Sequence, residues 1–282
     1  MISVIIPHRD RPERLALCLW ALERTEVHGY EIIVVDQSSK NLSQVVSICR
    51  NRGGRGKNRA CETRLVVGRE SPIVTLTDEK RHRVFNKPMA INDGISAAYG
   101  TTLTFLDCDS VPCKDFMRHA AWLNSSKGAQ SGITRLCYRV RHLPPNVPWQ
   151  PVEGCGELVD SAYEKYDEYP ISFEGYVAPE IDGKLYDDTL PEHIFGNSQF
   201  SIRRDKLGDT RCDEAYVGAG WEDLAFIAQI HRDARGSYKG KMIDQALFHV
   251  RNVRDPLSWS PACLNRDNHD RYVETFGGYK VS

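Results

Sequence analysis

The first fifty residues alternate between short apolar runs and amphipathic stretches. Residues 2–6 and 30–35 are apolar, mostly β-branched runs of strand length, and each gives way at once to polar residues. Between them, residues 12–24 have apolar groups at helical spacing behind Pro12, which suits the first turn of a helix. A second helix is predicted over 42–49. The order strand, helix, strand, helix is typical of a parallel sheet with crossover helices.

The same patterns predict the later elements, with two long loops among them. The basic, glycine-rich residues 50–64 show no period, and neither does the stretch 143–192, which is rich in Pro, Gly, Tyr and acids. We therefore expect both to be loops, the second lying over the active face. Further strands are expected at 65–67, 73–76, 102–106, 199–202 and 246–250, and further helices at 86–99 and 222–231.

Composition narrows the class of protein. The 282 residues are 41% hydrophobic and 27% charged with a net charge of -1, as in an ordinary soluble domain. This balance excludes a uniformly basic or acidic partner surface. Nine cysteines without regular spacing or a CxxC pair indicate reduced thiols rather than a disulfide framework or a zinc knuckle. Because the sequence shows no signal-peptide pattern and no run of membrane-spanning length, we expect a cytoplasmic protein.

Two acidic residues directly follow the predicted strand at 102–106. Asp107 and Asp109 flank Cys108, so both carboxylates are expected at the edge of the sheet where parallel strands end and ligands bind. A hard divalent cation between carboxylates and phosphate oxygens relieves the mutual repulsion of such a pair. Aspartates are also common in solvated turns after strands. The position after a central strand favours the metal site over the simple turn.

A second acidic pair opens the last predicted helix. Glu222 and Asp223 follow a glycine-rich turn that ends in Trp221. A carboxylate can take the proton from an attacking hydroxyl group, and a glycine-rich turn beside a tryptophan suits close approach of a sugar ring. Acidic residues also stabilise the first turn of any helix through its dipole. The glycines and the tryptophan favour the functional interpretation.

Four segments of the chain, taken in order, resemble one enzyme group. The opening SVIIPHRDRPERLALCLWAL and the later EIIVVDQSS resemble the nucleotide-binding half of inverting GT-A glycosyltransferases of the family 2 type. Residues 85–112 (FNKPMAINDGISAAYGTTLTFLDCDSVP) resemble the segment from FNRA to DxD in β-1,4-galactosyltransferases and chondroitin-type polymerases. Residues 196–226, with their Gly-rich turn and Glu-Asp pair, resemble the acceptor-side segment of the same group.

The resemblance implies an α/β fold of the GT-A type. A Rossmann-like nucleotide-binding half with a mixed, mainly parallel sheet would be fused to an acceptor-binding half. We expect a single domain with a nucleotide-sugar-binding subdomain at 1–112 and an acceptor-binding, catalytic-base subdomain at 113–282.

The resemblance also implies roles for residues on the donor side. Asp36 would hydrogen-bond the uracil or the ribose, and Lys87 would contact the diphosphate where the family has arginine. Gln37 replaces the second acid of the usual Asp-Asp-Gly-Ser. The residues expected to bind the nucleotide-sugar are Pro7, His8, Arg9, Asp10, Asp36, Lys87 and Asp107.

On the acceptor side, Asp223 matches the catalytic base of the group, while Glu222 would hold acceptor hydroxyls and Trp221 would form a stacking platform. Asp109 and the late His249 would ligate a metal, Mn²⁺ by the mixed oxygen and nitrogen donors, with Mg²⁺ as the second candidate. The implied reaction moves a hexose or N-acetylhexosamine from a UDP-sugar to a hydroxyl of a glycan-type acceptor, with inversion, as in polysaccharide biosynthesis.

Three alternatives stay open. A retaining transferase of the same fold would use Asp223 only to position the acceptor. A nucleotide-binding module would lack catalysis, although the intact acidic pairs and the late histidine argue against it. Nucleic acid is a less favoured partner or acceptor, suggested by the basic segments 50–64 and 80–83. The donor sugar, the acceptor, the linkage and the oligomeric state do not follow from the sequence.

Overall fold

The computed structural model describes most of the chain. The described ranges are 1–25, 27, 29–52, 61–70, 73–75, 81–144, 146–148, 151–168, 199–218, 220–233, 240–250 and 262–276. Within these ranges no helix has both the length and the apolar character needed to cross a membrane.

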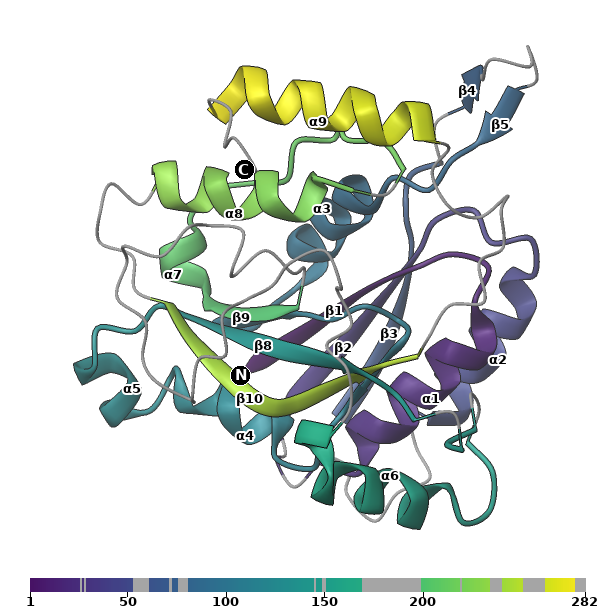
Figure 1. Cartoon of the computed structure of the whole chain (residues 1–282), viewed down its shortest axis with the longest axis vertical. Helices are drawn as coiled ribbons and strands as arrows, with labels where there is room; N and C mark the ends of the chain where they lie inside the picture. The colour runs from purple at the N-terminus through teal and green to yellow at the C-terminus, as the bar shows by residue number, and fades with distance from the viewer. Residues whose placement is uncertain are drawn as a thin grey trace.

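An eight-stranded sheet forms the centre of the molecule (Figure 1). Its strands are β1 (Ile2–His8), β2 (Tyr30–Asp36), β3 (Cys61–Val67), β6 (Thr102–Phe105), β7 (Ser110–Pro112), β8 (Arg135–His142), β9 (Phe200–Arg203) and β10 (Gly240–His249). The order is β3-β2-β1-β6-β9-β8-β10-β7. The first four strands are parallel, β9 runs antiparallel between β6 and β8, and β7 is antiparallel to β10. A separate antiparallel pair consists of β4 (Ile73–Thr75) and β5 (Arg81–Arg83).

Helices cover both faces of the sheet. They are α1 (Pro12–Glu23), α2 (Leu42–Arg52), α3 (Lys87–Ala97), α4 (Phe116–Trp122), α5 (Ser126–Gln130), α6 (Cys155–Glu164), α7 (Arg204–Leu207), α8 (Glu222–Asp233) and α9 (Ala262–Phe276), with a 3-10 turn at Tyr166–Glu168. Figure 1 shows α1, α2, α4 and α6 on one face and α3 and α8 on the other. α9 lies over α8, on the side away from the sheet.

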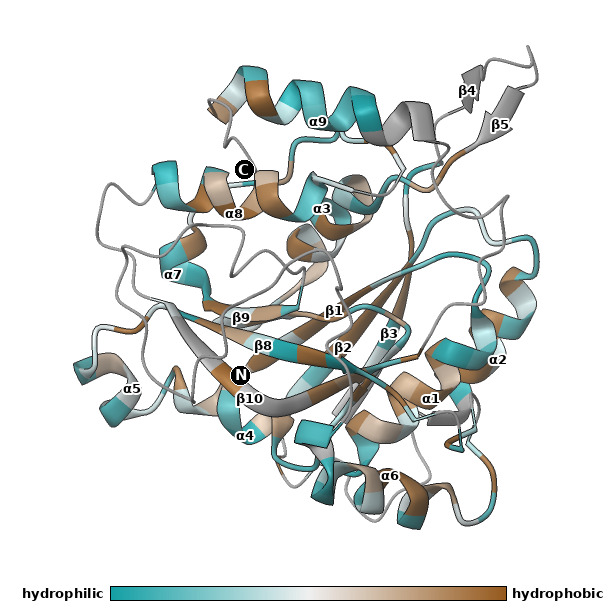
Figure 2. Ribbon diagram, viewed as in Figure 1, coloured by the Kyte–Doolittle hydropathy of each residue, from teal (hydrophilic) through white to brown (hydrophobic). Residues whose placement is uncertain are grey.

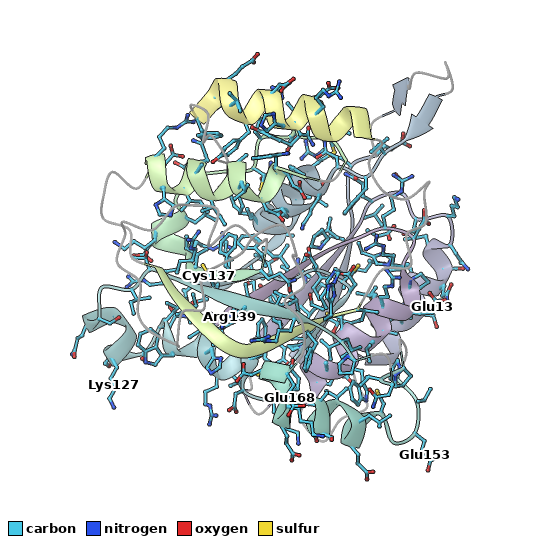
Figure 3. All side chains as sticks on the ribbon, viewed as in Figure 1. Glu13, Lys127, Cys137, Arg139, Glu153 and Glu168 are labelled. Atoms are coloured by element: carbon cyan, nitrogen blue, oxygen red, sulfur yellow. The ribbon has the colours of Figure 1, made fainter. Side chains whose placement is uncertain are left out.

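Burial on both faces explains why the first strands are continuous apolar runs. Every residue of β1 and β2 is buried. Val4 and Ile32 pack against α1, α2 and α4, whereas Ile5 and Val35 pack against α3 and α8. Figure 2 shows the resulting apolar strands between the helical layers. Side chains fill the space between these layers, with Cys137 of β8 in the interior (Figure 3).

Most of the predicted elements are present with boundaries shifted by a few residues, which confirms the mixed α/β class. The predicted strands correspond to β1, β2, β3, β4, β6, β9 and β10, and the predicted helices to α1, α2, α3 and α8. β8 and α9 have no counterpart among the predictions. Charged residues interrupt their apolar positions, so neither segment stands out as a buried strand or an amphipathic helix.

The predicted loop over 143–192 is wrong in its first half, where α6 forms. Cys155, Val159 and Ala162 are spaced by four and three residues, so they share one helical face. All three are buried in a cluster with α1, β7 and β10. The glycines, acids and prolines around them hide this period in the sequence. Residues 169–192 lie outside the described residues.

The predicted loop over 50–64 is too long. α2 continues to Arg52 and β3 already begins at Cys61. β3 is an edge strand that pairs with β2 through its backbone, so it forms without a continuous apolar run. Residues 53–60 and 76–80 lie outside the described residues, and with them most of the basic surface invoked for nucleic acid.

Strand directions bring residues from both halves of the chain to one edge of the sheet. β1 and β2 end there at His8 and Asp36. β10 is parallel to β8, and β8 and β6 are both antiparallel to β9, so β10 also ends at this edge, at His249. Strands from residues 1–112 and from 113–282 thus share a single sheet.

Close packing of α3 on the sheet gives a stability prediction. A Cβ atom on Gly94 would overlap with Ile5 Cγ2 and lie 3.2 Å from Val35 Cγ2. We expect Gly94→Ala to lower the free energy of unfolding by about 1–3 kcal/mol, because overpacking outweighs the better helix propensity of alanine. Urea denaturation followed by circular dichroism measures the change.

Ser96→Ala is the matched control, since Ser96 is exposed on the same helix. We expect this substitution to change the free energy of unfolding by less than about 0.5 kcal/mol. Equal stability of Gly94→Ala and wild type would contradict the close approach of α3 to β1.

Candidate active site

Backbone strain concentrates at the edge where the strands end. Among the described residues, the non-glycine residues with positive φ are Asp10, Ser38 and Trp221, at 52°, 60° and 70°. Asp10 follows β1, Ser38 follows β2 and Trp221 precedes α8. Such conformations cost on the order of 1–3 kcal/mol and cluster at functional sites. Three loops of this edge are therefore held in shapes that the local sequence alone does not favour.

A buried histidine–aspartate pair ties the loops after β1 and β2 together. His8 Nδ1 lies 2.8 Å from Asp36 Oδ1. The backbone N–H of Arg11 donates to His8 Nε2, so the ring proton sits on Nδ1 and is donated to Asp36. Ser39 donates both its backbone N–H and its hydroxyl to the same carboxylate. Burial alone would raise the pKa of Asp36, but the bonds from His8 and Ser39 outweigh it and hold the pKa below its ordinary value.

Asp10 fastens the same two loops at the surface. Its Oδ1 accepts the backbone N–H of Lys40 at 2.6 Å, and its own N–H donates to Ser39 Oγ at 2.8 Å. Arg9 Nε lies 3.6 Å from Asp10 Oδ2. Pro7 is buried near the end of β1, just before this loop. Five of the residues expected around the nucleotide, Pro7, His8, Arg9, Asp10 and Asp36, therefore lie at the ends of β1 and β2 or in the loop after β1.

Asp109 lies in a charge cluster that joins the two halves of the chain. Its Oδ2 accepts a hydrogen bond from Arg11 Nη1 at 2.8 Å, and its Oδ1 lies 3.2 Å from His249 Nε2. β10 brings His249 here by pairing it with Ser110, and the N–H of Val250 donates to the Asp109 carbonyl. Burial would raise the pKa of Asp109, but His249 and Arg11 hold it well below its usual range. Asp109 is therefore an ionised carboxylate.

The adjoining carboxylate and imidazole fit part of a divalent-metal site. Asp109 and His249 offer one oxygen and one nitrogen donor, a set that suits Mn²⁺. Across the described ranges, no group of three or more His, Cys, Asp or Glu side chains is arranged to hold a metal on its own. A cation at this position would complete its coordination with phosphate oxygens and water. The residues thus fit a metal that binds together with a diphosphate.

Lys87 connects the two acidic pairs. Its Nζ lies 2.8 Å from Asp107 Oδ1 and 3.3 Å from Asp223 Oδ1. Lys87 is the first residue of α3, whose cap Asn86 accepts the N–H of Met89 at 3.0 Å. Burial would lower the pKa of Lys87, but Asp107 and Asp223 raise it above its ordinary value. A charged ammonium therefore lies within reach of one acid from each half of the chain.

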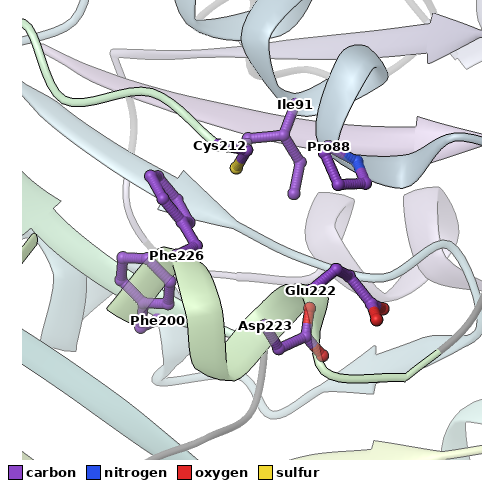
Figure 4. Close-up of a pocket in the computed structure, with 7 residues that line it drawn as sticks. All are labelled: Pro88, Ile91, Phe200, Cys212, Glu222, Asp223 and Phe226. Carbon is purple, nitrogen blue, oxygen red and sulfur yellow. The ribbon is translucent and has the colours of Figure 1, made fainter. Parts of the chain in front are cut away.

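Glu222 and Asp223 open α8 beside a pocket with apolar walls (Figure 4). Glu222 is 8% exposed, and its Oε2 has no hydrogen-bond partner among the described residues. Burial raises the pKa of Glu222, and the neighbouring Asp223 raises it further, to about 8. The surroundings of Glu222 thus favour its protonated form beside an ion-paired Asp223. The walls are Pro88, Ile91, Phe200, Cys212 and Phe226.

The segment that leads to this pair is fastened to α3. Asn92 exchanges two hydrogen bonds with the backbone of Cys212, both at 2.9 Å. Asn86 Nδ2 donates to the carbonyl of Glu214 at 2.7 Å, while the Asn86 N–H donates to Gln37 Oε1 at 2.7 Å. α3 therefore connects the loop after β2, on the expected nucleotide side, with the segment before α8.

Trp221 differs from the other expected site residues in its surroundings. Its ring centroid lies 4.7 Å from that of His269 and 5.4 Å from that of Tyr272, both on α9. Trp221 therefore packs against α9, and its stacking on an acceptor sugar stays a prediction. The remaining expected residues gather at the sheet edge in three groups, one around Asp36, one around Lys87, and the Asp109–His249 pair.

Arg11 and Asn86 belong to the site, although the sequence analysis misses both. Nothing in the sequence distinguishes Arg11, the partner of Asp109, from a surface arginine before a helix. Asn86 has a recognisable signal: it directly precedes Lys87-Pro88, and asparagine is a preferred cap where proline occupies the first turn of a helix.

Solved structures resemble this chain, whereas no protein-family model and no curated protein matches it. Staphylococcus aureus TarS 1-349 in complex with UDP-GlcNAc has a TM-score of 0.57 at 15% identity, covering 96% of this chain and 66% of that chain. Glucosyl-3-phosphoglycerate synthase from Mycobacterium tuberculosis, in complex with Mn²⁺ and UDP-glucose, has a TM-score of 0.53 at 12% identity, covering 100% of this chain and 80% of that chain. Mannosyltransferase PcManGT from Pyrobaculum calidifontis, in complex with GDP-Man and Mn²⁺, has a TM-score of 0.51 at 14% identity, covering 91% of this chain and 58% of that chain.

These similarities show the fold. The chain has the mixed α/β fold of GT-A glycosyltransferases, with a mainly parallel sheet, as the sequence resemblance implies. At identities of 12% and 15% they do not extend to substrates. The chain spans 60% of one TarS 1-349 structure and 39% of a longer TarS chain.

The raised pKa of Glu222 gives a pH prediction for stability. An unfolded glutamate loses its proton near its ordinary pKa of 4.5, whereas folded Glu222 keeps it up to about pH 8. Between these values the folded state binds more protons, so this group lowers the free energy of unfolding as pH rises. As the pH rises from 5 to 8, we expect the free energy of unfolding of Glu222→Gln to increase by at least ~1 kcal/mol relative to that of wild type, since one pKa unit corresponds to about 1.4 kcal/mol.

Urea denaturation at several pH values measures this difference. Glu153→Gln, at an exposed site, is the matched control and should show the same pH dependence as wild type. Parallel stability curves for wild type and Glu222→Gln would mean that Glu222 is ionised in the folded protein.

Proposed function

We propose that this protein is a metal-dependent glycosyltransferase. It moves a hexose or an N-acetylhexosamine from a UDP-sugar to a hydroxyl of a glycan-type acceptor, with inversion. The observation that carries the proposal is the position of Lys87 between Asp107 and Asp223 at the ligand-binding edge of a GT-A sheet. This arrangement offers a cation to a diphosphate and a carboxylate to an acceptor within one site.

Asp223 is the proposed base. The acceptor oxygen attacks the anomeric carbon while the bond from that carbon to the diphosphate oxygen breaks, and the acceptor proton passes to Asp223. Lys87, at 3.3 Å, favours the ionised form of Asp223 that this step requires. The raised pKa of Glu222 favours its protonated form, which donates a hydrogen bond to the sugars instead of competing for the proton.

The leaving group is a diphosphate, on which negative charge builds as the glycosidic bond breaks. Lys87 and Arg11 supply positive charge at the sheet edge where this group would lie. Asp109 and His249 would hold the divalent metal, which when bound neutralises the departing diphosphate.

The nucleoside is proposed to lie across the loops after β1 and β2, against Pro7, Arg9, Asp10 and Asp36. His8 has a different role in this proposal from the one the sequence implies. Both of its ring nitrogens are engaged inside the protein, so it orients Asp36 and has no ring nitrogen left for the nucleoside.

The role of Asp223 predicts a selective loss of transfer. We expect Asp223→Asn to lower the release of UDP from UDP-glucose or UDP-GlcNAc by at least about 100-fold, the usual contribution of a positioned base. The affinity for UDP should stay within about twofold, because Asp223 lies on the acceptor side. A coupled assay for UDP measures the first quantity, and calorimetry measures the second.

Asp233→Asn, at the other end of α8, is the matched control and should keep full activity. Retained turnover in Asp223→Asn would exclude this residue as the base. Nuclear magnetic resonance of the product with a hydroxyl acceptor tests inversion separately, and a product that keeps the anomeric configuration of the donor would favour the retaining alternative.

The Asp109–His249 pair predicts metal-dependent nucleotide binding. We expect Mn²⁺ to strengthen the binding of UDP to wild type. In the presence of Mn²⁺, Asp109→Asn or His249→Ala should lower the affinity for UDP at least about tenfold, because each takes away one metal ligand. In EDTA all variants should bind UDP as weakly as wild type does. Calorimetry with and without Mn²⁺ makes the comparison.

Asp115→Asn is the matched control, since Asp115 is a partly exposed aspartate that caps the start of α4. It should bind UDP and Mn²⁺ as wild type does. An undiminished Mn²⁺ effect in both Asp109→Asn and His249→Ala would place the metal elsewhere.

A further inference from the structure

A fourth apolar cluster lies apart from the three that pack on the sheet. It joins α8, the segment before it, and α9. α9 lies over α8 and away from the sheet in Figure 1, so it packs on the elements that hold the proposed base. The cluster consists of Tyr216, Leu224, Ala225, Ala228 and Tyr272, with Trp221 and Phe276 packed against it.

Asn268 is a buried polar residue of α9 in contact with this segment. It is 3% exposed, and its Nδ2 donates to the carbonyl of Val217 at 3.1 Å and to that of Gly220 at 3.0 Å. A side-chain amide has two donor hydrogens, so a single group satisfies both carbonyls. These carbonyls lie on either side of the turn that leads into α8.

The turn held by Asn268 has a demanding backbone. Gly218, Gly220 and Trp221 have φ values of 83°, 103° and 70°. Glycine adopts such values freely, whereas an L-residue such as tryptophan does so at a cost of roughly 1–2 kcal/mol. The carbonyl of Trp221 accepts the N–H of Ala225 at 2.9 Å, so the backbone of Trp221 sets the start of α8.

α9 also holds the side chain of Trp221. Its ring meets His269 edge-on, with 67° between the planes, and Tyr272 at 39°. Aromatic contacts of this kind contribute about 0.5–1.5 kcal/mol each beyond the area they bury. The ring contacts and the amide hydrogen bonds together offset the strain of the turn, and all of them come from α9.

We propose that Asn268 is a positioning residue for the proposed base. By holding the turn between Val217 and Trp221, it fixes the first turn of α8 and thereby the direction of Asp223. This inference rests on the proposed role of Asp223. The hydrogen bonds of Asn268 go to the turn before α8 and not to the loops after β1 and β2, so its loss should loosen the base without loosening those loops.

Three substitutions in the full chain weaken the hydrogen bonds of Asn268 to different extents. Asn268→Ala removes both donor hydrogens, Asn268→Ser keeps one donor, and Asn268→Asp keeps the shape but sets a carboxylate against two carbonyl oxygens. Asp267→Asn, exposed on the same helix, is the matched control. The measurements are hydrogen exchange by mass spectrometry, kcat and KM for UDP release from UDP-glucose and UDP-GlcNAc with Mn²⁺, and UDP affinity by calorimetry.

We expect Asn268→Ala and Asn268→Asp to speed hydrogen exchange over residues 216–226 and to lower kcat at least about tenfold, since displacement of a catalytic group by about 1 Å can cost 100-fold. Asn268→Ser should fall between them and wild type. Donor KM and UDP affinity should stay within about twofold, and exchange over residues 2–24 should not change. Asp267→Asn should match wild type throughout.

Unchanged exchange over 216–226, or faster exchange there with kcat unaltered, would overturn the proposal. Equal losses in kcat, UDP affinity and protection across the whole chain would overturn it too, since they would assign Asn268 to general stability. A wild-type protein that neither binds UDP nor releases it from either donor contradicts the proposed function instead. In that case the exchange data still decide whether Asn268 holds the turn.

Discussion

A largely enclosed ammonium group between two carboxylates organises the candidate site. Charges removed from water are tolerated in a folded protein only where opposite charges meet them. Lys87 begins α3, Asp107 follows β6 and Asp223 lies in the first turn of α8, so their ion pairs connect three elements that no single run of sequence connects. Any shift of α8 relative to α3 would separate these charges, which keeps the acceptor-side helix in register with the sheet.

Neighbouring acids in this site have different charges because their surroundings differ. Asp109 meets an arginine and a histidine and is ionised despite being buried. Glu222 is also buried but faces the charge of Asp223, which raises its pKa and favours its protonated form. One site thus holds a hydrogen-bond donor and a proton acceptor side by side. Sites that separate the protonation of like groups in this way are suited to acid–base chemistry.

The sequence predicts the parts of the fold in which local pattern and tertiary contacts agree. β1 and β2 are recognisable because burial on both faces demands continuous apolar runs. The acids at 107, 109, 222 and 223 stand out because they directly follow a strand or open a helix. α9 does not stand out, since it packs on a small cluster around Trp221 and is largely polar.

Partnerships between distant residues are the other part that local patterns do not reveal. The ion pair of Arg11 with Asp109 and the hydrogen bonds of Asn268 to the turn before α8 depend on segments that meet only in the folded protein. The same holds for the hydrogen bond between His8 and Asp36, which forms only because β1 and β2 lie side by side. Chemistry-bearing residue types are visible in a sequence, whereas the groups that orient them are set by topology.

The place of β9 in the sheet has a consequence for how the chain folds. β3, β2, β1 and β6 can pair once the first 105 residues of the chain exist, because their connections are local. β9 then inserts beside β6 from far along the sequence, β8 attaches through it, and β10 pairs with both β8 and the early strand β7. Contacts between such distant segments form slowly. During synthesis the donor-side loops therefore take shape early, and the charge cluster of Asp109 is completed only after His249 has left the ribosome.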